Sequence, residues 1–323
     1  MSYDETPPPA RRLPGRKPLT VAAAALVIGS LGGWLLYQGT SGPDGSGSSG
    51  ADTSAGASSR AAAPSGSPTD SKPGSGSGSD SDDNAPGGED PADLPLAGRV
   101  VVIDPGHNPR NSQHTTEINA PVHIGTTSKE CDTTGTSTNS GYAEAAFTLD
   151  VSHRLRTLLE KQGAKVTFTH DDDRPFGPCV DERAAIGNKA GADAALSIHA
   201  DGAAAGNRGF HVILPAKVKG EGADTSEIVG PSRDLGERIV SDFARATGSE
   251  RSNYIGGGTG LDVREDLGGL NLSTVPKVFI ECGNMRDAQD AALVTSADWR
   301  QKAAQGLADG IGSYLKSLKR SGT

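Results

Sequence analysis

Apolar residues are distributed in three different ways along this chain of 323 residues. Residues 20–37 form one long apolar run without a charged side chain. Residues 39–95 show no sustained apolar pattern and consist mainly of Gly, Ser, Pro, Ala and Asp. From residue 96 onward, short apolar runs alternate with amphipathic stretches. Only this last part can bury a hydrophobic core, so we predict one globular domain at residues 96–323.

Two periodicities predict the elements of this domain. Buried strands are expected where apolar residues are continuous or alternate, at residues 99–104, 165–170, 194–199, 209–214 and 277–281. Helices are expected where apolar residues recur every three to four positions, at residues 143–162, 181–190, 227–247 and 297–318. Strands that alternate with helices predict an α/β fold, with a mostly parallel or mixed central sheet of about six strands flanked by helices.

The apolar run at residues 20–37 has the length of a short membrane span. At about 1.5 Å per residue it extends about 27 Å, against a hydrocarbon core of roughly 30 Å. Basic residues precede it in the head 1–19, and none follows until Arg60. The positive-inside rule therefore places the head in the cytoplasm and the rest of the chain outside. We expect a single-pass cell-membrane protein; secretion after cleavage of this run as a signal peptide is the alternative.

Charge is concentrated between this run and the globular part. The chain has a formal net charge of −9, and residues 39–95 contain nine acidic and two basic residues. Such a polar segment buries too little apolar surface to fold, so we expect residues 38–95 to be a disordered linker. No basic cluster marks a nucleic-acid-binding face, and we expect no nucleic-acid partner.

Chemically capable side chains follow three of the predicted strands. His107 comes just after the strand at 99–104, His199 ends the strand at 194–199, and Glu281 ends the strand at 277–281. Sites in open α/β sheets assemble at the carboxyl ends of strands. Glu144 falls in the first turn of a predicted helix, where a carboxylate is also favoured as a simple cap. Taken singly, each histidine is more typical of a structural role; their combination suggests a metal site.

Four motifs in order carry a family resemblance. They are VVIDPGHN at 101–108, GYAEAAFTLDVSHRL at 141–155, ADAALSIHAD at 192–201 and VPKVFIECGNMRDAQDAALV at 275–294. Over residues 98–316 the chain resembles the zinc-dependent N-acetylmuramoyl-L-alanine amidases of the amidase-3 type. The resemblance implies one Zn²⁺ held by His107, Glu144 and His199, with Glu281 as the catalytic carboxylate. It also implies hydrolysis of the bond between N-acetylmuramic acid and the L-alanine of the peptidoglycan stem peptide. We expect the protein to be a monomer.

The chain departs from the family pattern between the first histidine and Glu144. The family often has a short glycine-rich stretch there, whereas residues 108–143 form an insertion that we expect to lie over the cleft. Most of this insertion, residues 108–141, has no sustained hydrophobic period and is expected to be a long loop. Whether this loop contains a hairpin is left open. Arg264 is expected to lie in a Gly-rich loop at residues 256–271 and to contact a peptide carboxylate.

The three cysteines form no CxxC pair, which excludes a zinc knuckle. Outside the cytoplasm Cys131 and Cys179 could form a disulfide, while Cys282 is expected to be a buried apolar residue. Asp104 is expected to bind its own turn or to orient a ligand histidine.

Two other functions remain open from the sequence. A zinc carboxypeptidase or endopeptidase acting on the stem peptide would use the same metal site. A catalytically silent wall-binding module is the alternative outside enzymes, although no expected ligand is missing.

Overall fold

A computed structural model describes residues 91–318 of the protein. The head 1–19 and the apolar run 20–37 lie outside the described residues, as does all of the expected linker except 91–95, where Pro91–Asp93 forms a 3-10 helix, η1. Among the described residues, no helix is both long and apolar enough to cross a membrane.

Six strands form one mixed sheet, in the order β4-β1-β5-β10-β6-β9. Their bounds are β1 Val100–Pro105, β4 Lys165–Phe168, β5 Ala194–Asp201, β6 His211–Pro215, β9 Leu261–Arg264 and β10 Lys277–Asn284. All neighbouring pairs are parallel except β10 and β6. The central strands β1, β5 and β10 are mostly buried, which explains their nearly continuous apolar sequences. The predicted α/β fold with about six strands is confirmed.

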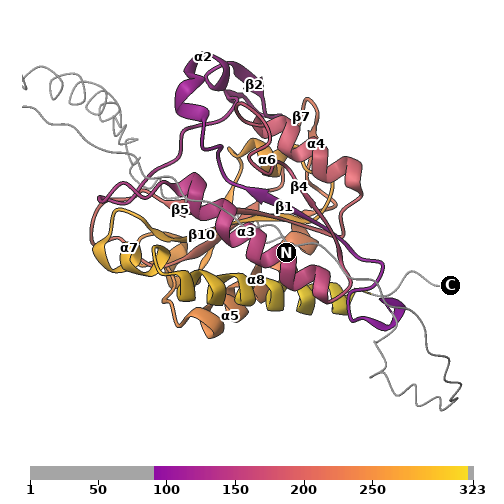
Figure 1. Cartoon of the computed structure of the whole chain (residues 1–323). Helices are drawn as coiled ribbons and strands as arrows, with labels where there is room; N and C mark the ends of the chain where they lie inside the picture. The colour runs from indigo at the N-terminus through magenta and orange to yellow at the C-terminus, as the bar shows by residue number, and fades with distance from the viewer. Residues whose placement is uncertain (1–90, 319–323) are drawn as a thin grey trace, which may run out of the picture. The chain divides into compact units, whose positions relative to one another are not determined.

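Helices cover both faces of the sheet (Figure 1). One face is covered by α3 Glu144–Lys161, α5 Val229–Thr247 and α8 Ala297–Ser317, and the other by α4 Val180–Ala190 and α6 Gly268–Asn271. A shorter helix, α7 Ala288–Val294, follows β10. Leu155 on α3 and Leu307 on α8 are fully buried, at positions where the 3.6-residue period predicts a core.

The inserted segment has its own small elements. They are the 3-10 helix η2 Asn111–Gln113, the helix α2 Thr115–Ile118, and the antiparallel strands β2 Pro121–His123 and β3 Ser128–Glu130. The last two form the hairpin that the sequence left open. In Figure 1, α2 and β2 lie at the top of the domain, on the side of α4 and α6.

Several elements were missed because they are short or surrounded by glycines. They are β9, α6, α7, the 3-10 helix η3 Gly256–Gly258, and the two-residue strands β7 Lys219–Gly220 and β8 Ala223–Asp224. The expectation that Arg264 lies in a loop is wrong, since it is the last residue of β9. Among the described strands, β9 pairs with β6 alone and forms one edge of the sheet, so partly exposed residues replace the buried run of a central strand.

Candidate metal centre and active site

His107 lies just past the end of β1, on a tightly packed turn. Gly106 donates a backbone hydrogen bond to the Ile198 carbonyl at 2.9 Å, and its own carbonyl accepts one from Thr148 Oγ1 at 2.8 Å. His107 has φ of 62°, in the left-handed region that non-glycine residues rarely adopt. Such backbone strain is typical of functional positions, where surrounding contacts fix an otherwise unfavourable geometry.

Glu144 is the first residue of α3, as the sequence predicts, but its carboxylate does not cap that helix. Its Oε2 accepts a hydrogen bond from the Thr136 backbone at 2.8 Å, and its Oε1 accepts one from the Ala200 backbone at 3.1 Å. These two donors come from the inserted segment and from β5. They orient the carboxylate toward the end of the sheet, so the capping alternative does not describe this residue.

His199 lies on β5, between a glycine and an aromatic ring. The Phe279 ring stacks on the imidazole with centroids 5.3 Å apart and an interplanar angle of 1°. A Cβ atom at Gly106 would lie only 2.4 Å from His199 Cε1, so only glycine allows the turn to approach this closely. The imidazole therefore has a narrowly defined position.

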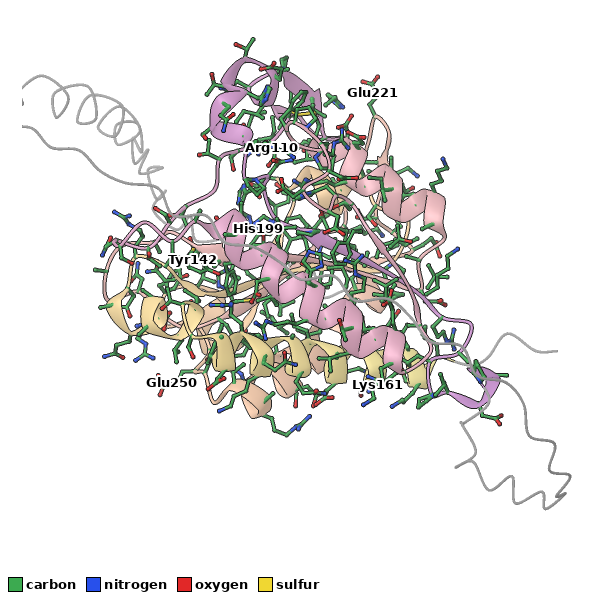
Figure 2. The ribbon with its side chains drawn as sticks, in the orientation of Figure 1. Arg110, Tyr142, Lys161, His199, Glu221 and Glu250 are labelled. Carbon is green, nitrogen blue, oxygen red and sulfur yellow. A yellow bond between two sulfur atoms is a disulfide. The ribbon has the colours of Figure 1, made fainter. Side chains whose placement is uncertain are left out.

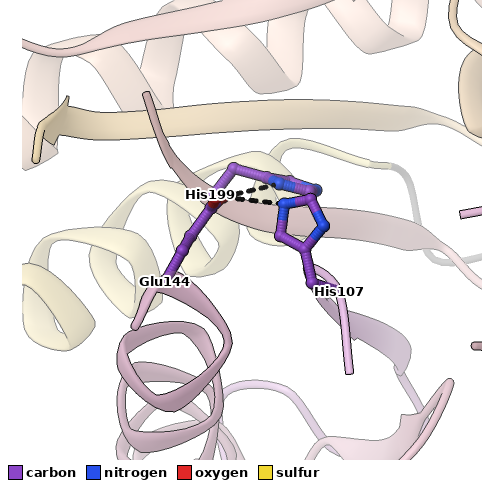
Figure 3. A group of neighbouring side chains, drawn as sticks. All are labelled: His107, Glu144 and His199. Carbon is purple, nitrogen blue, oxygen red and sulfur yellow. Dashed lines mark hydrogen bonds and ion pairs between the residues drawn. The ribbon is translucent and has the colours of Figure 1, made fainter. Parts of the chain in front are cut away.

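These three side chains converge, although they come from distant parts of the chain (Figure 3). Glu144 Oε1 lies 3.1 Å from His107 Nε2 and 3.1 Å from His199 Nδ1, and all three candidate ligand atoms lie within 4.8 Å of one another. Figure 2 shows His199 near the centre of the domain, whereas Lys161, Glu221 and Glu250 lie at its periphery.

The electrostatics of this group favour a cation. Burial opposes a charge on His107, but the carboxylates of Glu144 and Asp132 outweigh burial and raise the pKa of His107 to about 10. Burial likewise opposes ionisation of Glu144, yet His107 and His199 hold the pKa of that carboxyl well below its usual range. An ionised carboxylate beside an imidazole with a strong tendency to take up positive charge is suited to a metal ion.

Glu281 lies beside this group. In the sheet its Cα pairs with that of His199 on β5 and with that of His211 on β6, so the three side chains share one face. Its Oε2 atom is buried and has no hydrogen-bond partner in the part of the chain that the structure describes. Burial, reinforced by the negative charges of Glu144 and Asp201, raises the pKa of Glu281 well above its usual value. A buried, unpaired carboxyl of this kind is typical of a group that transfers protons.

The four residues line one cleft of about 360 Å³. Strands and the inserted segment both contribute to its walls, since Lys129, Thr133 and Thr136 line it as well. The insertion thus borders the cleft, as we expected.

Arg264 also lines the cleft but is already paired with an acid. Its Nε and Nη2 atoms each donate to the Asp266 carboxylate at 2.8 Å. Lys129 of β3 reaches the same carboxylate at 3.4 Å. Burial opposes the ionised state of Asp266, but the arginine bonds outweigh it and lower the pKa of this carboxyl to about 2. Two cations and one anion therefore form the rim where β9 meets the inserted hairpin.

Asp104 does not contact a ligand histidine, so that expectation is wrong. Its carboxylate is fully buried and accepts hydrogen bonds from Thr169, Arg183, Ser197 and Lys277 at 2.7–3.0 Å. The acid beside His107 is instead Asp132, whose Oδ1 lies 3.7 Å from His107 Nδ1. Asp132 could not be identified from the sequence, because nothing in the non-periodic insertion shows where its residues lie.

Cys131 and Cys179 form a disulfide, with an S–S distance of 2.05 Å. It joins the insertion to the residue before α4, which is the pairing that we considered from the sequence. Cys282 is a free, buried cysteine on β10, and the expectation of an apolar core position is confirmed.

Comparison with known proteins gives a consistent result. A family model described as N-acetylmuramoyl-L-alanine amidase (Amidase_3) matches residues 101–313. The chain is 42% identical to the N-acetylmuramoyl-L-alanine amidase Rv3717 of Mycobacterium tuberculosis over 68% of this chain and 88% of that protein. The crystal structure of the amidase Ami1 from Mycobacterium smegmatis has a TM-score of 0.63 and 38% identity, covering 69% of this chain and 99% of that one. The apo form of Ami1 from Mycobacterium abscessus gives the same TM-score at 41% identity, over 68% of this chain and all of that one. This chain belongs to the N-acetylmuramoyl-L-alanine amidase family.

Proposed function

We propose that this protein is a zinc-dependent amidase that hydrolyses the bond between N-acetylmuramic acid and the L-alanine of the peptidoglycan stem peptide. The observation that carries the proposal is the convergence of His107, Glu144 and His199 beside the buried carboxyl of Glu281. The family to which the chain belongs supports the choice of this amide bond over others.

The donor set fits zinc. Two imidazole nitrogens and one carboxylate oxygen are ordinary ligands of catalytic Zn²⁺, which needs a further open position. Tetrahedral ligands at Zn–N and Zn–O distances of about 2.0–2.2 Å are separated by about 3.3 Å. Glu144 Oε1 lies 3.1 Å from a nitrogen of each histidine, close to this separation, and the three ligand atoms all lie within 4.8 Å of one another.

When bound, zinc would lower the pKa of a coordinated water and polarise the scissile carbonyl. The residues of the chain divide the remaining tasks. His107, Glu144 and His199 hold the ion, and Phe279 and Gly106 fix the His199 ring. Glu281 Oε2 has no hydrogen-bond partner among residues 91–318 and is free to accept the proton of the attacking water. Its raised pKa also suits the return of that proton to the alanine nitrogen as the C–N bond breaks.

The charged rim of the cleft suits a peptide with carboxylates. Lys129 and Arg264 share the single carboxylate of Asp266, so these three side chains together retain one positive charge, although Glu130 also lines the cleft. We propose that Arg264 contacts a carboxylate of the stem peptide. A bidentate guanidinium contact would require Asp266 to give up at least one of its two bonds.

The reaction can be tested by digesting purified peptidoglycan and analysing the products by mass spectrometry. Intact stem peptides with a free L-alanine amine are the expected products. Shortened stems would instead identify a carboxypeptidase or endopeptidase, and no release in zinc-replete buffer would leave only wall binding. A chelator should abolish release, and added Zn²⁺ should restore it.

We also propose that residues 20–37 anchor the protein and that residues 38–95 let the domain reach the wall. The uncharged run and the basic residues before it support an anchor with the domain outside. Fractionation of cells expressing the full chain tests this: recovery in the membrane pellet is expected, and a shortened form in the medium would identify a cleaved signal. The monomeric state expected from the sequence stays a prediction.

A further inference from the structure

One nitrogen of His107 faces the inserted segment instead of the sheet. Its Nδ1 lies 3.1 Å from both the carbonyl oxygen and the Oγ1 of Thr133, and 3.7 Å from Asp132 Oδ1. The other nitrogen, Nε2, faces Glu144. A proton held on Nδ1 by these acceptors leaves the Nε2 lone pair available to a metal, so the insertion selects the tautomer that can act as a ligand.

Asp132 is itself held in place by three donors. Arg183 Nη2 and Asn111 Nδ2 reach its Oδ2 at 2.9 and 3.0 Å, and the Thr133 backbone reaches its Oδ1 at 2.8 Å. Asn111 also donates to the Thr133 carbonyl at 2.7 Å. The acid is only 7% exposed, so its charge is weakly screened at the distance of His107.

A row of buried charges continues from Asp132 into the core. Arg183, on α4, binds Asp132 with Nη2 and Asp104 Oδ1 with Nη1 at 2.8 Å, and Lys277 of β10 binds Asp104 Oδ2 at 3.0 Å. The four side chains alternate in sign, and each is less than 10% exposed. Each side chain therefore constrains the position of the next, from Lys277 on the central strand β10 to Asp132 next to His107.

The backbone of the insertion is tied to α4 at the same point. Cys131, the residue before Asp132, forms the disulfide with Cys179, and its carbonyl accepts the Val180 amide at 2.8 Å. Arg183 lies one turn further along that helix and also donates to the His107 carbonyl at 3.2 Å. Covalent and ionic contacts thus fix residues 131–133 relative to His107.

We propose that Asp132 is a positioning residue for His107, and that the inserted segment thereby completes the metal site as well as bordering the cleft. The inference rests on the proposed zinc site. It assigns a chemical role to residues 131–133 of the inserted segment. Loss of the Asp132 charge weakens zinc retention even though Asp132 does not touch the metal.

The test compares two Asp→Asn variants in the full-length protein. Asp132→Asn keeps the shape of the side chain and removes its charge. Asp193→Asn is the matched control: Asp193 also binds an arginine, Arg99, at 3.1 Å and a backbone amide, that of Val100, at 2.8 Å, but it lies just before β5, at the opposite end of that strand from His199. For each protein we measure the zinc Kd by chelator competition, the visible spectrum of the Co²⁺ form, and the Tm.

Asp132→Asn is expected to raise the zinc Kd about 10–100-fold and to change the Co²⁺ spectrum. Asp193→Asn should lower the Tm but leave both metal readouts unchanged. A folded Asp132→Asn protein with the zinc Kd of the unsubstituted chain would overturn the inference. If the unsubstituted chain itself binds no zinc, the proposed function fails and this inference fails with it.

A second variant decides the matter if Asp132→Asn does not fold. Arg183→Lys keeps a positive charge next to Asp104 but cannot bridge both acids, because an ammonium lacks the planar fork of guanidinium. Its zinc Kd should rise by about tenfold. An unchanged Kd in this folded variant would equally overturn the role of Asp132.

Discussion

Replacing Gly106 by alanine would add one methyl group at the point where the turn after β1 meets the His199 ring. The new Cβ would lie 2.4 Å from His199 Cε1, 2.5 Å from Nδ1 and 2.7 Å from the Ile198 carbonyl oxygen. Ordinary contact begins at 3.4 Å, so the imidazole or the turn has to move by about 1 Å. The Phe279 ring stacked on His199 restricts the movement of the imidazole.

The consequences for stability and for activity should differ in size. Overpacking of this kind costs about 1–3 kcal/mol of unfolding free energy, which lowers the Tm by roughly 2–12 °C in a domain of this length. A displacement of about 1 Å is far larger than the tolerance of a zinc–nitrogen bond, and misplacement on this scale costs about 100-fold in rate. We therefore expect Gly106→Ala to fold, to bind zinc weakly and to lose about 100-fold in kcat/KM.

Gly230→Ala provides the control. Gly230 lies in the first turn of α5, and outside its own helix no heavy atom lies within 4 Å of a Cβ placed there. Its kcat/KM should equal that of the unsubstituted enzyme, with a nearly unchanged Tm, because the helix propensity of alanine is offset by the ring of Pro231 that follows. Zinc content, peptidoglycan hydrolysis and thermal unfolding are measured for both variants. Full activity in zinc-loaded Gly106→Ala would refute the claim that this contact fixes the His199 ligand.

Four further predictions follow from the same geometry. Glu281→Ala should keep zinc and lose at least about 100-fold in kcat, whereas His199→Ala should lose both; zinc analysis beside an activity assay separates the two. Lys277→Met should cost about 3–5 kcal/mol of unfolding free energy, measured by urea titration, because it leaves the buried Asp104 carboxylate with one cation fewer. Burial opposes ionisation of Asp104, but two buried cations hold the pKa of its carboxyl far below the unfolded value of about 3.9. The contribution of Asp104 to stability is therefore complete above that pH and declines as the pH falls below it. Urea titrations at pH 5 and pH 3 should show this decline in the free energy of unfolding. Gly310→Ala should cost about 1–3 kcal/mol, seen as a lower Tm, because its Cβ would lie 2.8 Å from the backbone of α5.

The sequence located the candidate ligands because each follows from a local pattern. His199 and Glu281 end apolar runs that only buried strands explain, and Glu144 begins a helix with a clear 3.6-residue period. Carboxyl ends of neighbouring parallel strands meet at one edge of the sheet, so their proximity follows from the fold class. The register adds what periodicity cannot give, namely that Glu281 pairs directly with His199.

Other features depend on contacts between residues that are distant in the sequence, and no local pattern indicates them. Asp132 acquires its role from Arg183, 51 positions further along, and from the disulfide next to it. Lys277 is the first residue of an apolar strand and is only 2% exposed, which its sequence position would not suggest. Its partner Asp104 lies 173 positions earlier, so neither residue alone indicates the ion pair.

The buried charges are better explained by the site than by stability. Replacing a buried ion pair by apolar side chains of similar volume is often neutral or stabilising by about 1–4 kcal/mol. A row of four alternating charges between β10 and Asp132 is therefore an inefficient way to fill a core. It does, however, define one arrangement, because shifting any member leaves a buried charge without its partner. That arrangement ends at His107, whose left-handed backbone is not otherwise favoured. The ionic row and the strained turn thus both act on the side chain of His107. Both features are explained if the site requires this imidazole to be held in one position.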